Sequence, residues 1–103
     1  MKIIRRAFSS GQPVVFSIES VDEFQEHVLN SPTPVLVDFY ADWCGPCKTL
    51  GPRLEEKVAS RGGAVLMAKI NVDDAGEVAA DHGITAVPTV VAYANGEIIG
   101  EFK

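Results

Sequence analysis

The chain has 103 residues and a net charge of −5, and 47% of its residues are hydrophobic, which suits one domain with its own core. No apolar run approaches the roughly 20 residues that a membrane-spanning helix needs. Residues 1–12 contain three basic residues and no acid, so the rest of the chain carries a net charge of −8. An acidic body of this kind argues against nucleic acid as a main partner, because its phosphates would be repelled.

The first twelve residues are predicted to be a basic N-terminal tail, and residues 13–103 to form the domain. The stretch Arg6-Ala7-Phe8-Ser9-Ser10 is similar to the processing site of a mitochondrial targeting peptide. It is short for a whole targeting peptide, and an ordinary flexible tail is the alternative. The expected location is the mitochondrial matrix, with the cytoplasm as the alternative.

Strands and helices are predicted to alternate along the chain, which indicates an α/β fold with a mixed sheet and helices on both faces. Ser20 and Glu23 form a capping-box pattern at the start of a first helix that ends before Pro32. The dipeptide Asn95-Gly96 predicts a hairpin turn. The other helices are expected from about Cys44 to Ser60, with a kink at Pro52, and from Asp74 to His82; the strands are expected at residues 14–18, 35–40, 65–72, 89–93 and 97–102.

Cys44 and Cys47 are the only cysteines, and they are separated by Gly45 and Pro46 at the start of the second predicted helix. The positive end of a helix dipole and its unpaired N–H groups favour a thiolate at this position. The pair therefore predicts a reversible dithiol–disulfide switch, with a static disulfide as the alternative. Zinc would need about four ligands, and no metal is expected, although a cluster shared between two subunits through Cys44 is conceivable.

Asp38 lies in the otherwise apolar run of residues 35–40. Burial of a lone carboxylate is costly, so its pKa should be raised. A carboxylate that titrates near neutral pH can accept the proton of Cys47. The alternative is that Asp38 points to solvent at an end of the sheet.

Together these features resemble the thioredoxin family, and the phrasing of residues 50–55 resembles its mitochondrial branch. The resemblance implies a thioredoxin fold. Two departures are that the chain stops at Lys103, before the family's final C-terminal helix, and that Tyr40 stands where many members have Trp. Without that helix, part of one sheet face should be uncovered. The residues that carry the resemblance are Val35 to Tyr40, Trp43 to Lys48, Pro52, Lys69, Asp73 and Val87-Pro88-Thr89.

The resemblance also implies roles for individual residues. Cys44 should be the more exposed nucleophile, and Cys47 the buried thiol that resolves the mixed disulfide. Lys69 should be the partner of Asp38, so the expected catalytic residues are Cys44, Cys47, Asp38 and Lys69. A cis peptide bond is expected before Pro88. The expected substrate-binding residues are Trp43, Gly45, Pro46, Val72, Ala86, Val87 and Pro88, although Trp43, Val72, Ala86 and Val87 could instead belong to the core.

The resemblance implies a protein disulfide reductase that receives electrons from NADPH through thioredoxin reductase, a flavoprotein. Its substrates would be disulfide-containing proteins such as peroxiredoxins. No organic cofactor is expected, because the dithiol is the redox group, and the protein is expected to be a monomer. The alternatives are a thioredoxin-like binding module without turnover, and an oxidase or isomerase of the same fold. Pro46 favours the reducing role by resemblance.

Overall fold

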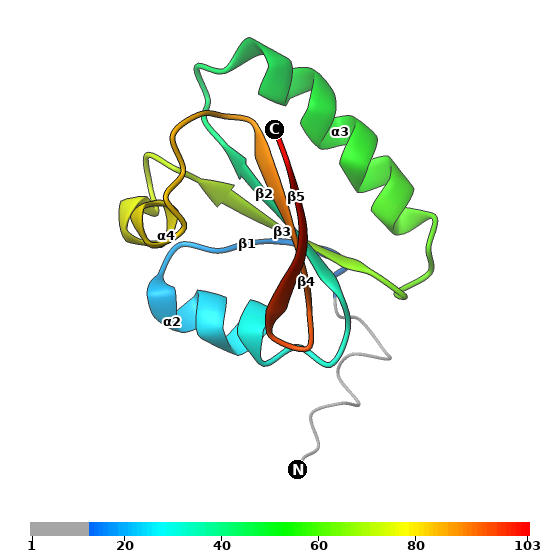
Figure 1. Cartoon of the computed structure of the whole chain (residues 1–103). Helices are drawn as coiled ribbons and strands as arrows, with labels where there is room; N and C mark the ends of the chain where they lie inside the picture. The colour runs from blue at the N-terminus through cyan, green and yellow to red at the C-terminus, as the bar shows by residue number, and fades with distance from the viewer. Residues whose placement is uncertain (1–12) are drawn as a thin grey trace.

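The computed structural model describes residues 13–103, in which five strands form a single sheet of order β1-β3-β2-β4-β5 (Figure 1). Strands β1, β3 and β2 are parallel, whereas β4 and β5 run antiparallel to their neighbours. The predicted mixed sheet is therefore confirmed, and each strand lies within two residues of its expected position. The strands are β1 (Val15–Ser17), β2 (Val35–Tyr40), β3 (Leu66–Asn71), β4 (Thr89–Ala94) and β5 (Glu97–Phe102). The tail of residues 1–12 lies outside the described residues.

Helices cover both faces of the sheet, as predicted. Helix α3 (Gly45–Ala59) lies on one face, and α2 (Val21–Phe24) and α4 (Gly76–Asp81) lie on the other (Figure 1). Pro52 lies within α3, and a kink there stays a prediction. Within residues 13–103, no helix is long and apolar enough to span a membrane.

The first helix differs from the expected regular helix, because α2 continues as a π-helical segment, η1 (Gln25–Leu29). Ser20 is its N-cap and its hydroxyl accepts a hydrogen bond from the Glu23 N–H, as the capping pattern predicts. The Glu23 carboxylate accepts from the N–H of Glu19 and not from that of Ser20. The cap therefore satisfies donors on both sides of the helix start.

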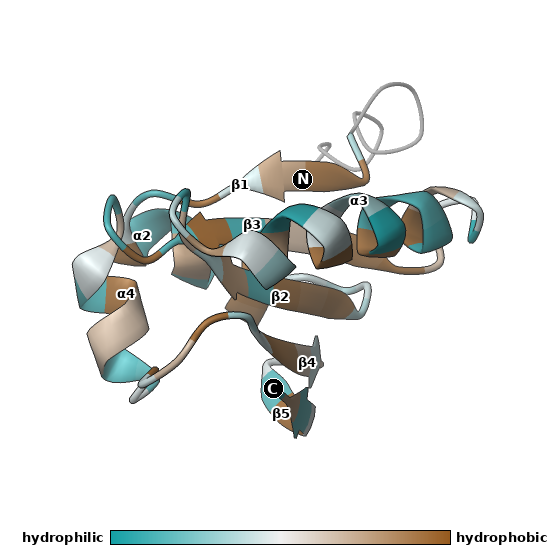
Figure 2. Ribbon diagram, turned by 90° about the horizontal axis from the view of Figure 1, so that it is seen from above, coloured by the Kyte–Doolittle hydropathy of each residue, from teal (hydrophilic) through white to brown (hydrophobic). Residues whose placement is uncertain are grey.

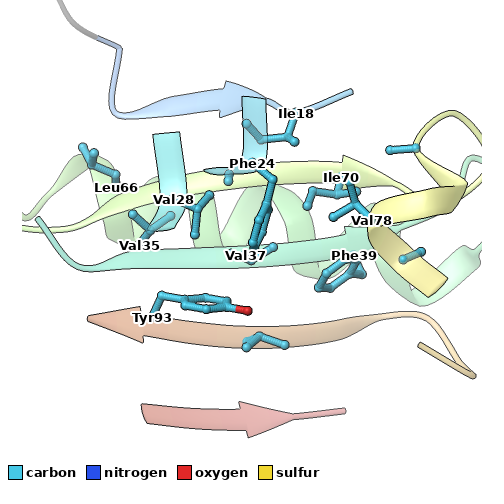
Figure 3. Packing of buried hydrophobic residues seen from close by; sticks show 14 residues of the cluster. Ile18, Phe24, Val28, Val35, Val37, Phe39, Leu66, Ile70, Val78 and Tyr93 are labelled. Atoms are coloured by element: carbon cyan, nitrogen blue, oxygen red, sulfur yellow. The ribbon is translucent and has the colours of Figure 1, made fainter. Parts of the chain in front are cut away.

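The sheet face beneath α2 and α4 is filled by hydrocarbon. Alternate residues of a strand point to opposite faces, so Val35, Val37 and Phe39 of β2 share this face. They pack with Phe24, Val78 and other buried side chains into one hydrophobic core (Figure 3). Buried side chains of this core come from both helices and from strands β2, β3 and β4, and the partly buried Phe16 of β1 packs against them.

The opposite face, beneath α3, is more polar. It receives Asp38 of β2 and Lys69 of β3. Figure 2 shows strands that are mostly hydrophobic, while α3 carries hydrophilic residues along much of its length. Further along this face, an apolar depression of about 400 Å³ lies between the last turns of α3 and the strands, beside the exposed Ile99 of β5. This depression agrees with the expectation that part of one sheet face is uncovered.

The turn between β4 and β5 is made by Asn95 and Gly96, as predicted. Both residues have positive φ, 53° and 79°, the conformation that this type of hairpin turn requires. A Cβ on Gly96 would lie only 3.0 Å from the carbonyl oxygen of Leu29. Glycine is therefore needed here both for its backbone conformation and for the close approach of the first helix.

Candidate functional site

The cysteine pair lies at the start of α3, where the chain turns out of β2. The N–H of Cys44 donates to the carbonyl of Ala41 at 3.2 Å, which closes the turn before the helix. Cys44 is the N-cap of α3, and Pro46 occupies the first turn, where the lack of an N–H costs nothing. The N–H of Cys47 donates to the Cys44 sulfur at 3.2 Å. A negative charge on the Cys44 sulfur would therefore be stabilised by the helix N-terminus.

Cys44 and Cys47 are joined by a disulfide, with their Cα atoms 5.3 Å apart. Both cysteines are buried in this form, with exposed fractions of 4% for Cys44 and 7% for Cys47, so the greater exposure expected of the Cys44 sulfur is not seen at the level of the whole residue. The two residues and Ala41 form a small buried cluster, against which Val72 and Val87 pack. These neighbours pack against the cluster from outside α3, which sequence spacing does not reveal.

Trp43 is the most exposed large hydrophobic residue described, at 70%. Its indole N–H donates to the Asp73 carboxylate at 3.0 Å. Asp73 is itself positioned by Asn71 at the end of β3, whose side-chain oxygen accepts the Asp73 N–H at 2.9 Å. The alternative of a core tryptophan is therefore wrong, because the ring lies on the surface beside the disulfide.

The residues expected to bind substrate fall into three groups. Val72 and Val87 are partly buried against the disulfide cluster. Gly45 and Pro46 are exposed in the first turn of α3. Ala86 is also exposed, and its carbonyl accepts a hydrogen bond from the Thr89 hydroxyl, so it is not part of the buried cluster.

Pro88 is half-buried at the loop before β4. The peptide bond between Val87 and Pro88 is cis, which confirms the expectation. Since Val87 packs against the disulfide cluster, this loop lies beside the cysteine pair.

Asp38 is only 2% exposed, so the alternative that it points to solvent is wrong. Burial raises its pKa to about 6; the positive charge of Lys69 opposes this rise, and the negative charge of Glu55 adds to it. The predicted upward shift is confirmed. A carboxyl group with this pKa can exchange protons near neutral pH.

Lys69 is the register neighbour of Asp38 on the adjacent parallel strand, so both side chains lie on the α3 face. The expected pairing of these two is replaced by another ion pair, in which the Lys69 ammonium lies 2.7 Å from the Glu55 carboxylate. Glu55 is partly exposed, so it keeps its charge at a smaller desolvation cost than Asp38 does. Burial alone would lower the pKa of Lys69, but the hydrogen bond and charge of Glu55 raise it above its usual value.

Sequence reasoning missed two residues of this site, Gly51 and Glu55. Both follow Cys47 at intervals of four residues, a spacing that places all three on one face of α3. A Cβ on Gly51 would lie 4.0 Å from Asp38 Oδ2 and 3.8 Å from Lys69 Nζ. The helical spacing from Cys47 was the signal that could have found them.

Within residues 13–103, no group of three or more His, Cys, Asp or Glu side chains is placed to hold a metal ion. The redox-competent group of the described site is the Cys44–Cys47 disulfide.

The sequence matches the thioredoxin family model over residues 15–103. It is 63% identical over 98 residues to a probable thioredoxin-2 of Caenorhabditis elegans, covering 95% of this chain and 67% of that protein. It is 51% identical over 87 residues to the mitochondrial thioredoxin of Mus musculus, covering 84% of this chain and 52% of that protein. The chain therefore spans about half the length of the mammalian relative.

Solved structures agree with this match. The thioredoxin of Malassezia sympodialis has a TM-score of 0.79 and 37% identity, covering 88% of this chain and 79% of that one. The oxidised mitochondrial thioredoxin 3 of Saccharomyces cerevisiae also has a TM-score of 0.79, with 29% identity, covering 94% of this chain and 86% of that one. With its Cys-x-x-Cys disulfide at the start of a helix, the chain belongs to the thioredoxin family of thiol–disulfide oxidoreductases.

Proposed function

We propose that this chain reduces disulfides of other proteins by dithiol–disulfide exchange through Cys44 and Cys47. The Cys44 thiolate attacks one sulfur of the partner's disulfide and bonds to it, and the partner's other sulfur leaves as a thiolate. Cys47 then attacks the Cys44 sulfur, which re-forms the disulfide of this chain and releases the second partner thiolate. The partner thereby gains the two electrons that the dithiol loses.

The observation that carries this proposal is the position of Cys44 as the N-cap of α3, with its sulfur accepting the Cys47 N–H. A thiolate is the attacking species in such exchange, and a helix N-terminus lowers the cost of forming it. Cys47, one turn further into the helix, is already within bonding reach of Cys44. The same geometry suits the return of Cys47 to release the partner.

The partner would dock on the surface around the disulfide. Trp43 supplies an exposed aromatic face that Asp73 holds in place, and such anchors often dominate binding energy. Val72 and Val87 extend this apolar surface, and the backbone of Val87 would pair with an extended segment of the partner. The exposed Gly45, Pro46 and Ala86 and the neighbouring Pro88 complete the docking surface.

Asp38 would accept the Cys47 proton during release, with Lys69 tuning its charge. This role is supported by the burial of Asp38 and its pKa of about 6. Both residues lie on the sheet face beneath the helix that carries Cys47.

Electrons would reach the disulfide from NADPH through thioredoxin reductase, and peroxiredoxins would be among the acceptors. The mammalian relatives named mitochondrial thioredoxins support a location in the mitochondrial matrix, and we propose that the chain acts as a monomer. Residues 1–12 are proposed as a remnant of a targeting peptide ahead of the domain at 13–103. Subcellular fractionation and sedimentation of the purified chain check location and oligomeric state.

Reduction of insulin disulfides with dithiothreitol as the electron donor tests the activity. The wild-type chain should turn over rapidly and Cys44→Ser should not, since it lacks the nucleophile. Cys47→Ser should instead accumulate a covalent complex with insulin, visible on a non-reducing gel. Absence of both turnover and trapped complex would contradict the proposal and favour a binding module.

The direction of the reaction is tested by equilibration with reduced and oxidised glutathione. A reductase keeps a disulfide that resists reduction by glutathione, whereas an oxidase of the same fold would stay mostly as the dithiol. Mass spectrometry after alkylation measures the two forms. A mostly reduced chain in a glutathione mixture would overturn the reducing role.

A further inference from the structure

The ion pair between Lys69 and Glu55 lies directly beside Asp38. Lys69 and Asp38 are register neighbours on parallel strands, and their side chains point to the same face. The ammonium nevertheless binds Glu55, at 2.7 Å, and within residues 13–103 it makes no ion pair with Asp38. The Lys69 ammonium also lies 5.1 Å from the centre of the Tyr40 ring. The ammonium is thus ion-paired with Glu55, while its charge still acts on Asp38.

Asp38 has an unsatisfied oxygen as a result. Its Oδ1 is buried and, among the described residues, no group donates a hydrogen bond to it. Buried carboxylates usually have such a donor. The charge of Lys69 acts on Asp38, but its ammonium is hydrogen-bonded to Glu55. The site of a Cβ on Gly51 is 4.0 Å from Asp38 Oδ2 and 3.8 Å from Lys69 Nζ, so the two groups face the same gap under α3.

Glu55 also shares a cavity with the resolving cysteine. Cys47, Glu55 and Lys69 line one cavity of about 250 Å³, together with Asp42 and Lys48. Cys47 and Glu55 are two helical turns apart on the same face of α3. The position of Glu55 is therefore set by the same helix that positions the reacting sulfur.

We propose that Glu55 is a positioning residue for the exchange reaction: it holds the Lys69 ammonium away from Asp38 and so keeps Asp38 an effective proton acceptor for Cys47. This inference rests on the proposed reductase function. Glu55 acts on the reaction through Lys69, to which its carboxylate is hydrogen-bonded.

Two physical effects of Glu55 on Asp38 have the same direction. Its negative charge disfavours a second negative charge nearby, which raises the pKa of Asp38 beyond the rise that burial causes. By binding Lys69, it also keeps the cation from pairing with Asp38, which would lower that pKa. Asp42 and Lys48 lie exposed at the rim of the neighbouring cavity, and neither is among the charges that shift the pKa of Asp38.

The affected step is the release of the partner. The Cys47 thiol gives its proton to the Asp38 carboxylate, and the resulting thiolate attacks the Cys44 sulfur. The Cys44–Cys47 bond forms as the bond between Cys44 and the partner breaks, and the electron pair leaves on the partner's sulfur. A weaker base at position 38 slows this step and leaves the first attack by Cys44 unchanged.

A titration of the Asp38 carboxyl carbon by NMR tests the coupling directly, in wild type, Glu55→Gln and Glu56→Gln. Glu56 is the exposed neighbour on α3, and its variant changes the net charge equally. The pKa of Asp38 should fall by about one unit in Glu55→Gln and stay near the wild-type value in Glu56→Gln. Glu55→Asp retains the charge, so the pKa of Asp38 should stay closer to the wild-type value than in Glu55→Gln. No shift, a rise, or equal shifts in both Gln variants would overturn the proposal.

A double-mutant cycle with Lys69→Met separates the two effects of Glu55. Without the ammonium, Glu55→Gln should lower the pKa of Asp38 by less than half as much. An unchanged shift in the Lys69→Met background would overturn the part played by Lys69.

Stopped-flow reduction of a protein disulfide gives the functional readout. Glu55→Gln should slow release on the order of threefold, because a weaker general base reacts more slowly, while the first attack keeps its rate. Equal slowing of both steps would overturn the inference. If the wild-type chain reduced no disulfide at all, the proposed function would fail, whereas the titration would still decide whether Glu55 controls Asp38.

Discussion

The two faces of the sheet differ in what they bury. The face beneath α2 and α4 holds hydrocarbon from Phe24, Val37, Phe39 and their neighbours, with the partly buried His82 ring packed against Phe24 and Phe39. The face beneath α3 holds a buried acid, Asp38, and the Lys69–Glu55 ion pair. Burial of the Asp38 carboxylate opposes folding, whereas burial of the Phe39 ring favours it. One face therefore stabilises the domain, and the other sustains an unfavourable group next to the reacting sulfurs.

The largest effect is expected on the hydrocarbon face. Phe39 is fully buried, and its ring centroid lies 5.0 Å from that of His82. Phe39→Ala should lower the free energy of unfolding by about 3–5 kcal/mol, because it removes buried area and leaves a cavity. Urea denaturation followed by circular dichroism measures this loss. Ile99→Ala is the matched control at an exposed apolar site, and an equal loss in both would contradict the contrast between core and surface.

The intermediate effect is expected at Asp38 and has the opposite sign for stability. The raised pKa of Asp38 means that the folded state binds the proton more tightly than the unfolded chain, whose pKa is near 3.8. The stability that the fold gains from binding this proton is therefore fully present below pH 3.8 and is lost as the pH rises through about 6. Asparagine carries no charge, so Asp38→Asn avoids the cost of a buried carboxylate at high pH. At pH 7.5 the free energy of unfolding of the variant should be higher by about 2 kcal/mol, a value reduced to allow for solvent around the partly exposed Lys69–Glu55 pair.

The same substitution should stabilise the fold but slow the reaction. Asp38→Asn should slow release of the partner about a hundredfold, the lower end of general-base contributions, and should leave the first attack nearly unchanged. Stopped-flow rates separate the two steps, and unfolding in urea at pH 4 and pH 7.5 gives the stability. A variant that lost stability at pH 7.5, or that slowed both steps alike, would remove the contrast between the two faces.

The smallest effect is expected at Gly51, where the α3 face has room for one more methyl group. A Cβ there meets Lys69 Nζ and Asp38 Oδ2 at ordinary contact distances. Gly51→Ala should stabilise the domain by about 0.5–1 kcal/mol through helix propensity. It should also raise the pKa of Asp38 slightly, because the methyl group displaces solvent from the carboxylate. Thermal unfolding and the NMR titration measure both, and a destabilised variant would show that the gap is tighter than the contact distances imply.

Local sequence signals were enough for most of the fold. The continuous apolar run of β2 predicted a central strand, Ser20 predicted a helix start, and Asn95-Gly96 predicted a hairpin. Each of these depends on residues that are close together in the chain. The π-helical segment of residues 25–29 was not predicted, because its hydrogen-bond pattern has no distinct spacing of apolar residues.

The site was predictable where one residue's own chemistry decided the outcome. Burial disfavours the charged form of a lone acid in an apolar strand, and this is the largest of the effects on the pKa of Asp38. The choice of Lys69 between two carboxylates depends on distances across three elements, and the resemblance assigned it to Asp38 instead of Glu55. The surroundings of the cysteine pair likewise include Val72 and Val87, which come from later parts of the chain.

The strand order also governs when the reactive pair becomes covered as the chain is made. Strands β1 and β2 are not neighbours, and each pairs in parallel with β3, so neither finds that partner until residue 71 has been synthesised. Cys44 and Cys47 precede β3, and Val87, which packs against them, comes later still. Pairings between distant segments form slowly, and domains fold as units during synthesis. Until its last third is made, the chain therefore lacks Val87, which packs against the cysteine pair in the folded domain.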